Sequence, residues 1–220
     1  MRLFDYPASG NCYKVRLLLS HLGVPCEIVT VDIAAGDTLT DEFLRRNPAG
    51  RTPVLETDAG ESIAESGAIL LYLARGTALL PDDPGDQARI HQWLFFEQNL
   101  LEPNIGTARF WRLTGRAALR PEAWERHREA GIAALEVLER HLGAQDWLAL
   151  GRFGVADIAL YAYAHVAGDA AIDMARYPAL RAWLARVAAR PGHIGDLAPY
   201  PASLTAGASH SAHDRPAPGA

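Results

Sequence analysis

A small group of polar side chains stands where the first predicted strand of the chain gives way to the first predicted helix. Ser9, Asn11 and Cys12 follow a break at Pro7 and open a helical run of apolar residues. The first N–H groups of a helix lack partners within the helix, and the helix dipole favours negative charge beside them. The hydroxyl of Ser9 could therefore help to stabilise an anion, although the same side chain could simply cap the helix.

Cys12 offers a different chemistry, because a thiol near a helix N-terminus can serve as a nucleophile. The residue also falls in the apolar helical pattern with Val15 and Leu18, which favours a place in the core. Of the two cysteines in the chain, Cys12 and Cys26, neither belongs to a C-x-x-C pair or a zinc-ligand set. This usage is typical of a reducing compartment, so we expect a cytoplasmic protein.

Two further positions combine unusual residue types with a predicted element boundary. Pro53 follows Thr52 at the start of a predicted strand, where a proline is expected only at a sheet edge because it cannot donate a ladder hydrogen bond. Glu65 and Ser66 precede a predicted helix. Ser66 and the free N–H groups behind it suit a carboxylate, and Glu65 suits an ammonium group, with a plain helix cap as the alternative.

The elements that must position these residues follow from the spacing of apolar residues and from turn signals. The first part of the chain predicts a strand (2–6), a helix (12–22), a strand (27–33), a short helix (41–46), a strand (53–56), a returning strand (61–64) and a helix (69–75). A strand, a helix and a strand in succession normally place the two strands parallel. The pattern therefore indicates a small α/β domain.

The rest of the chain is predicted to be helical, after a stretch at 80–85 with the composition of a linker. The predicted helices cover 88–111, 121–143, 156–166 and 178–190. From residue 202 the chain contains Ala, Ser, Gly, Pro and His without a period, which predicts disorder. We therefore expect one domain over 1–78, an all-helical domain over 86–195 and a disordered tail over 202–220.

The overall composition excludes several classes of protein. The chain has 220 residues and is 49% hydrophobic, enough to form a core without a metal or disulfide. A formal net charge of −5 argues against nonspecific binding of nucleic acid or of anionic membranes. No apolar run is long enough to span a bilayer. His210 and His213 lie in the predicted tail without further ligands, so we expect no metal.

Four stretches of the chain resemble, in order and in spacing, the motifs of cytosolic glutathione transferases. They are SGNCYKVRL (9–17), NPAGRTPVL (47–55), ESGAI (65–69) and FGVADIA (153–159). The context of Ser9 is most similar to serine-type members such as the theta and zeta classes and related bacterial enzymes. The resemblance implies a thioredoxin-like α/β domain followed by an all-α helical-bundle domain. It also implies glutathione as cosubstrate, no metal, and a homodimer, for which we expect a contact face at 90–93.

The resemblance also assigns roles to the N-terminal polar residues. It implies that the hydroxyl of Ser9 activates the glutathione thiol, a role that Tyr6 fills less well because packing is the better interpretation of a residue at a strand end. Asn11 is the rival to Ser9, since it falls where some members carry a reactive cysteine and its amide could donate to sulfur. Because a free thiol ionises near pH 8.5, such donors matter at neutral pH.

Glutathione itself is expected to lie along the loops that carry the second and third motifs. The resemblance implies a cis bond between Thr52 and Pro53 that turns the main chain of Val54 toward the ligand, where it can pair like an added strand. Glu65 and Ser66 are expected to hold the γ-glutamyl ammonium and carboxylate groups. Arg51 is expected near the glycyl carboxylate, with a solvated surface arginine as the alternative.

The electrophile pocket is expected on the first long helix of the second half. Arg109, Phe110 and Trp111 are the main candidates, and Asn104 is a further one, although apolar residues at this spacing often form plain core. The fourth motif departs from the family pattern, because Gly154 stands at the helix N-cap where family members usually carry Ser or Thr. Glycine is tolerated there, and Asp157 can still accept main-chain N–H groups, so this motif is interpreted as structural.

The resemblance implies a glutathione transferase that activates the glutathione thiolate for attack on small apolar electrophiles. Glutathione-dependent reduction of peroxides or disulfides is an alternative, since it uses the same activated thiolate and needs no protein disulfide. A noncatalytic ligand-binding or interaction module is a third interpretation. The intact set of Ser9, Arg51, Pro53, Glu65 and Ser66 argues against such a degenerate relative.

Overall fold

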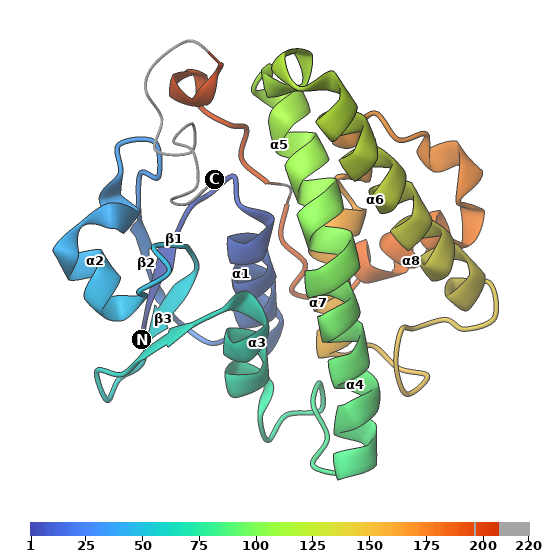
Figure 1. The fold of residues 1–220 in the computed structure, drawn as a ribbon. Helices are drawn as coiled ribbons and strands as arrows, with labels where there is room; N and C mark the ends of the chain where they lie inside the picture. Colours follow the sequence, from blue (N-terminus) through green and yellow to red (C-terminus); the bar gives the residue numbers. More distant parts are fainter. Residues whose placement is uncertain (196, 207–220) are drawn as a thin grey trace.

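The protein, in a computed structural model that describes residues 1–195 and 197–206, consists of a mixed α/β part followed by a helical part (Figure 1). The α/β part contains β1 (Arg2–Asp5), α1 (Gly10–Leu22), β2 (Glu27–Thr30), a 3-10 helix (Asp37–Leu39), α2 (Asp41–Arg46), β3 (Val54–Glu56), β4 (Ser62–Ala64) and α3 (Ser66–Ala74). Within the described ranges, no helix is both long and apolar enough to cross a membrane.

The four strands form one sheet in the order β2-β1-β3-β4. β1 pairs with β2 in parallel, whereas the β1–β3 and β3–β4 pairs are antiparallel. Alternate residues of β1 serve opposite faces: Leu3 packs with Val15 and Ile69 beneath α1 and α3, and Phe4 packs with Phe43 of α2. This arrangement confirms the expected thioredoxin-like domain, with α1 and α3 on one face and α2 on the other (Figure 1).

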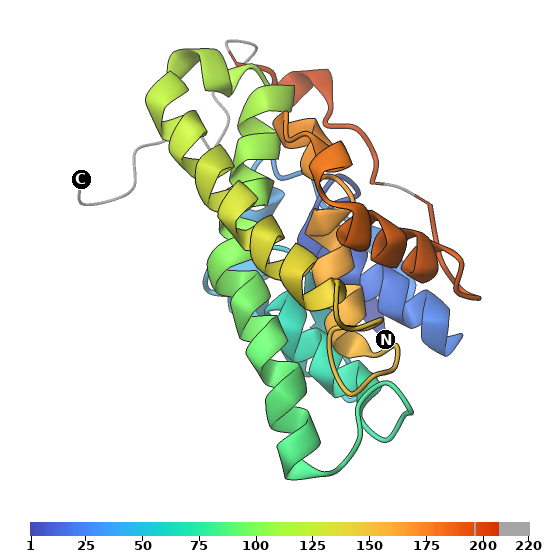
Figure 2. The same cartoon turned by 90° about the vertical axis from the view of Figure 1, so that its right-hand side faces the viewer.

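The second part is a helical bundle built around α7. Its elements are α4 (Pro84–Phe96), a π-helix (Glu97–Gly106), α5 (Thr107–Leu113), α6 (Pro121–Leu142), α7 (Val155–Ala164), α8 (Pro178–Ala188) and 3-10 helices at Arg116–Leu119, Ala167–Ala170, Met174–Arg176 and Ala202–Leu204. Every residue of α7 is buried, and α1, α4 and α8 all pack against it. Figure 2 shows α6 alongside the continuous path of α4, the π-helix and α5. The predicted all-α second domain is thus confirmed.

The long helix predicted over 88–111 forms one continuous rod, but its middle is π-helical. Pro103 lies inside this segment and cannot donate a main-chain hydrogen bond, which favours local departure from α-helical pairing. The segment also carries Ile105 against Gly131 of α6, where a Cβ atom would come within 2.6 Å of the Ile105 side chain. A larger residue at this position would require the end of the Ile105 side chain to shift.

The start of α7 matches the structural role predicted for the fourth motif. Asp157 accepts hydrogen bonds from the main-chain N–H of Gly154 at 3.0 Å, from that of Leu148 at 3.2 Å and from the Trp183 indole at 2.8 Å. Burial raises the pKa of Asp157 to about 6, against the opposing effect of these donors. The carboxylate thus ties the helix N-terminus, the preceding loop and α8 together.

Part of the C-terminal segment is ordered, contrary to the disorder expected from residue 202. Leu204 is fully buried against Tyr6 and Cys12, and the main-chain oxygen of Leu204 accepts a hydrogen bond from the Arg116 guanidinium. Ala206 then donates its main-chain N–H to Thr114 at 2.8 Å. The burial of one leucine side chain therefore orders a segment whose composition alone predicts disorder. Residues 207–220, with His210 and His213, lie outside the described residues.

Candidate active site between the two domains

A cavity of about 360 Å³ opens between the α/β domain and the helical domain. Its lining includes Ser9 and Asn11 from the start of α1, and Phe110 and Trp111 from α5. A smaller cavity of about 60 Å³ adjoins it and is lined by residues of the second and third motifs. The two share four lining residues, namely Asn11, Arg51, Thr52 and Glu102. Together they form one site with two connected compartments.

Ser9 occupies the junction that the sequence indicated, at the N-cap of α1. Its backbone is extended, and its hydroxyl oxygen accepts a hydrogen bond from the main-chain N–H of Cys12 at 3.3 Å. The hydroxyl also makes a side-chain hydrogen bond with the Cys12 thiol, and Ser9 lines the larger cavity, where its proton can turn to a ligand instead. Capping and anion stabilisation are therefore compatible in this residue.

Asn11, the second residue of the same helix, is held in a defined orientation. Its carbonyl oxygen accepts from the ammonium of Lys14 at 2.7 Å and from the hydroxyl of Ser66 at 3.2 Å. Its NH₂ group donates to Glu102 at 3.3 Å, at the wall that both compartments share. The amide thus presents its donor side to the site and its acceptor side to the buried interior.

Lys14 is a residue that the sequence analysis missed, and its ammonium is buried behind Asn11. It forms an ion pair with Glu97 at 2.7 Å, and each side chain is at most 2% exposed. Burial raises the pKa of Glu97, while Lys14 acts in the opposite direction. A lysine within an apolar helical run was the one available signal for this role, whereas no local pattern points to its partner on the π-helix.

Cys12 lies in the core and lines neither compartment, in agreement with the apolar pattern. The main-chain N–H of Tyr6 donates to its sulfur at 3.3 Å, and burial raises the pKa of the thiol to about 11. Tyr6 is also buried, and burial raises the pKa of its phenol to about 12. Neither group is an anion near neutral pH.

The loop before β3 carries a cis peptide bond between Thr52 and Pro53. Both residues line the smaller compartment, and Asn47 steadies the loop by donating its side-chain NH₂ to the main-chain oxygen of Arg51 at 2.7 Å. Val54 is buried and pairs with β1 and β4 in the sheet. The Arg51 side chain is exposed at the junction of the two compartments, where it is free to meet a ligand.

The start of α3 forms the far end of the smaller compartment. Glu65 has a φ of 70°, in the left-handed region that a residue with a side chain rarely adopts. Such strain costs about 1–3 kcal/mol and is common at ligand-binding sites. Ser66 is buried at the first position of α3, so its hydroxyl and the helix N-terminus face the compartment.

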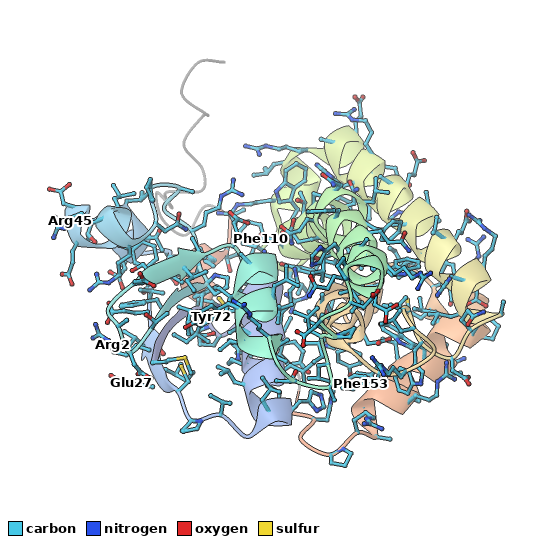
Figure 3. The ribbon with its side chains drawn as sticks, turned by 90° about the horizontal axis from the view of Figure 1, so that it is seen from below. Arg2, Glu27, Arg45, Tyr72, Phe110 and Phe153 are labelled. Atoms are coloured by element: carbon cyan, nitrogen blue, oxygen red, sulfur yellow. The ribbon has the colours of Figure 1, made fainter. Side chains whose placement is uncertain are left out.

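The wall opposite Ser9 is partly the one predicted. Phe110 and Trp111 line the larger cavity, and Phe110 lies at the boundary between the two domains in Figure 3. Arg109 is instead buried outside the lining and bonds to Asp169 at 2.9 Å. Asn104 also points elsewhere, since its side chain bonds to the main-chain oxygen of Leu100 and to His127 of α6.

Three aromatic or acidic residues of the larger cavity were missed by sequence reasoning. Tyr200 lines it from the C-terminal segment, stacks edge-on against Phe110 at 5.2 Å and accepts a hydrogen bond from Arg109 at 3.1 Å. Tyr163 of α7 and Glu102 complete this wall. Gly10 and Gly106 permit the approach of Tyr163, because a Cβ atom on either would lie within 3 Å of its ring. These contacts arise only in the folded chain.

Within residues 1–195 and 197–206, the structure brings together no cluster of three or more His, Cys, Asp or Glu residues that could hold a metal ion.

Comparison with known proteins places both parts of the chain in one family. The family model for the glutathione S-transferase N-terminal domain matches residues 1–75, and that for the glutathione S-transferase C-terminal domain matches residues 121–186. The chain is 33% identical over 213 residues to Glutathione S-transferase 3 of Zea mays, covering 91% of this chain and 95% of that protein. It is 32% identical over 193 residues to the Disulfide-bond oxidoreductase YfcG of Escherichia coli (strain K12), covering 84% and 89%.

A similar fold is seen in a solved structure described as a possible glutathione S-transferase from Rhodopseudomonas palustris. The two have a TM-score of 0.85 and 49% sequence identity, and the match covers 88% of this chain and 96% of the other. With family models on both domains and relatives matched over almost their full length, the chain belongs to the glutathione S-transferase family.

Proposed function

We propose that this protein is a glutathione transferase that binds glutathione as a thiolate and directs its sulfur at a small electrophile in the larger cavity. The observation that carries the proposal is the meeting of the Ser9 hydroxyl and the Asn11 NH₂ group in the larger cavity, at the N-terminus of α1. The smaller compartment adjoins this point, because Asn11 also lines it. The names of the maize and Rhodopseudomonas relatives agree with this activity.

Glutathione is proposed to lie across both compartments. Its γ-glutamyl carboxylate would take the hydroxyl of Ser66 and the N-terminus of α3, and its ammonium group would pair with Glu65. Arg51, at the junction, suits the glycyl carboxylate, and the main chain at the cis peptide between Thr52 and Pro53 suits the cysteinyl backbone. Val54, expected in this role, lines neither compartment and pairs with β1 and β4 instead. This pose brings the sulfur to Ser9 and Asn11.

Activation of the thiol needs a preference for the charged form. Lowering a thiol pKa of 8.5 by two units requires about 2.7 kcal/mol. A hydrogen bond to a charged group contributes about 1.5–3 kcal/mol, and the helix N-terminus adds about 0.3–1 kcal/mol or more when buried. Ser9 with the start of α1 can therefore supply most of the effect, and Asn11 can supply the remainder.

The reaction proposed for the bound thiolate is addition or displacement. The sulfur forms a bond to an electrophilic carbon, and a leaving group such as chloride departs with the electron pair of the broken bond. Phe110, Trp111 and Ile33 offer an apolar surface to the electrophile. We assign the protein to the serine-type transferases because Ser9 lines the larger cavity at the N-terminus of α1, and the theta or zeta subclass stays a prediction.

Reduction of disulfides is the second candidate function, favoured by the name of the Escherichia coli relative. The buried thiol of Cys12, with its raised pKa, is poorly suited to serve as a redox nucleophile. A reductase would therefore use the glutathione thiolate itself, at the same site. The complete set of ligand-facing residues argues against the third interpretation, a noncatalytic module.

We also propose a homodimer. Phe95 on α4 is 66% exposed, and Tyr72 on α3 and Leu100 on the π-helix are each 48% exposed. Such apolar side chains are typical of surfaces that a partner covers. The face predicted at 90–93 is partly wrong, because Ile90 and Trp93 point into the core.

Free thiols at Cys12 and Cys26 agree with the expected cytoplasmic location.

A panel of second substrates tests the activity. We expect glutathione-dependent turnover of a chloro-nitrobenzene or an isothiocyanate to exceed turnover of a hydroperoxide or a mixed disulfide. Turnover of the mixed disulfide alone would establish the reductase instead, and no turnover with any of them would favour a binding module.

Binding is tested separately with the Ser66→Ala variant. If Ser66 holds the γ-glutamyl carboxylate, glutathione affinity should fall by about 1–3 kcal/mol, the cost of an unpaired charged group. Calorimetry gives this value directly. Unchanged affinity would reject the role of Ser66.

A further inference from the structure

We propose that Lys14 is a positioning residue that fixes the orientations of Asn11 and Ser66, and thereby joins the thiol end of the glutathione site to its γ-glutamyl end. The inference rests on the proposed function of the site. It assigns a role to a buried cation that touches neither compartment and that the proposed reaction does not use directly.

The ammonium of Lys14 has three N–H donors, and the structure gives it three acceptors. These are the Oδ1 atom of Asn11 at 2.7 Å, the Oε2 atom of Glu97 at 2.7 Å and the Oγ atom of Ser66 at 3.3 Å. The side chain is only 1% exposed, so water does not compete for these partners. Its ring contact with Tyr163, at 5.3 Å from the centroid, closes the remaining side.

The first consequence is the direction of the Asn11 amide. An ammonium can only donate, so it selects the carbonyl side of Asn11 and leaves the NH₂ side toward the site. Glu102 accepts from this NH₂ group at 3.3 Å and favours the same orientation from the cavity side. When a bound sulfur takes the place of that contact, Lys14 keeps Asn11 a donor rather than an acceptor where the sulfur lies.

The second consequence concerns the hydroxyl of Ser66. Its oxygen accepts from Lys14, and its proton goes to the same Asn11 oxygen at 3.2 Å. A carboxylate bound at the start of α3 would draw this proton away, and the Asn11 oxygen would then depend on Lys14 alone. The ammonium of Lys14 thus orients two donors: the Ser66 hydroxyl at the γ-glutamyl end and the Asn11 NH₂ group at the thiol end.

A purely structural role is a weaker explanation for this arrangement. A buried ion pair is often no more stabilising than well-packed apolar residues of the same volume, because both charges must be desolvated. Lys14 and Glu97 also come from different domains, α1 and the π-helix, and meet directly behind the two site residues. The position of the pair therefore points to control of the site.

The test compares variants that break the same ion pair in different ways. Glu97→Gln removes the charge of the partner and leaves Lys14 on Asn11 and Ser66. Lys14→Met/Glu97→Gln removes the ammonium as well and leaves no uncompensated buried charge, so it should fold even if Lys14→Met alone does not. The readout is the ultraviolet absorbance of thiolate in the complex with glutathione, followed against pH.

Relative to Glu97→Gln, the double variant should raise the pKa of the bound thiol by about one unit or more, the size expected when a hydrogen bond to a charged group is lost. In an Asn11→Ala background the same change at Lys14 should have little further effect on that pKa, because Lys14 acts through Asn11. A general loss of stability would affect both backgrounds equally.

Two outcomes would overturn the inference, and the first of them would also contradict the proposed function. If the wild-type protein titrates bound glutathione like the free thiol, the proposed function fails and the inference fails with it. If the wild type lowers the pKa but the double variant matches Glu97→Gln, the function stands and Lys14 has no positioning role.

Discussion

The hydroxyl of Ser9 combines two hydrogen-bonding roles at the start of α1. Its oxygen caps the helix through the N–H of Cys12, and the hydroxyl lines the cavity, where its proton can turn to a ligand. Asn11 adds a second donor whose direction is set from behind by Lys14. Two donors on one helix turn make the thiolate, rather than the thiol, the favoured form of a bound sulfur.

The contribution of Ser9 should be visible in the pH dependence of the reaction. Ser9→Ala should lower the transfer rate by tenfold or more near neutral pH, since a hydrogen bond to a charged group is worth about 1.5–3 kcal/mol. The deficit should shrink above about pH 8.5, where the thiol ionises unaided. Asn11→Ala measures the contribution of the second donor in the same way, and steady-state rates from pH 6 to 9 provide the measurement.

A different result would reassign the catalytic role. If Ser9→Ala keeps both its rate and its pH profile while Asn11→Ala loses them, then Ser9 is only a helix cap. The serine-type label would then be wrong for this protein.

At the residue scale, the sequence predicts side chains that belong to local motifs and misses those whose role depends on distant partners. Ser9, Asn11, Arg51 and Ser66 all face the site. The role of Lys14 depends on Glu97, which lies 83 residues away along the chain. Arg109 was predicted at the wall with Phe110 and Trp111, but its guanidinium is held by Asp169 and Tyr200, which lie 60 and 91 residues away along the chain.

Among the elements, the C-terminal segment contributes most beyond expectation. Tyr200 forms part of the cavity wall, and Leu204 fills a buried hole beside Tyr6. Composition alone favoured disorder here, because it averages over many residues and cannot weigh one well-packed side chain. By contrast, the strands and helices of the α/β domain were predictable from period and turn signals, including the cap at Ser9.

The packing of this segment can be measured through Leu204→Ala. The variant should lose about 2–5 kcal/mol of unfolding free energy, the usual cost of truncating a fully buried leucine. Leu119→Ala is the control, since Leu119 is 71% exposed and its truncation should change stability by less than about 0.5 kcal/mol. Urea unfolding of both variants gives the comparison. Equal stability for the two would show that the segment does not pack as described.

For the whole molecule, the two domains meet at the site, and each contributes part of it. Sequence reasoning predicted the fold class because the hydrophobic period changes from strand and helix to helix alone at the 80–85 linker. It could not predict the π-helical turn that brings Glu97 and Glu102 to α1, since a π-helix has no distinct apolar period. Of the contact face predicted at 90–93, Ile90 and Trp93 are buried in the core, which a local pattern on α4 did not reveal.

The dimer prediction is tested on the exposed surface of α3 and α4. Phe95→Asp should convert a dimer into a monomer at micromolar concentration, because a charge would replace a large apolar side chain in the interface. Leu119→Asp changes another exposed apolar residue, outside α3 and α4, and should leave the mass unchanged. Light scattering reports both masses. A monomeric wild type, or a dimeric Phe95→Asp variant, would count against this interface.

The central claim is that the site holds glutathione as a thiolate, and titration of the wild-type complex tests it most directly. Thiolate absorbance in the ultraviolet, recorded against pH with glutathione bound, should give a pKa at least about one unit below the 8.5 of a free thiol. The same titration with S-methylglutathione supplies the baseline, since it can bind but cannot ionise at sulfur. A bound thiol that titrates near 8.5 would contradict the account.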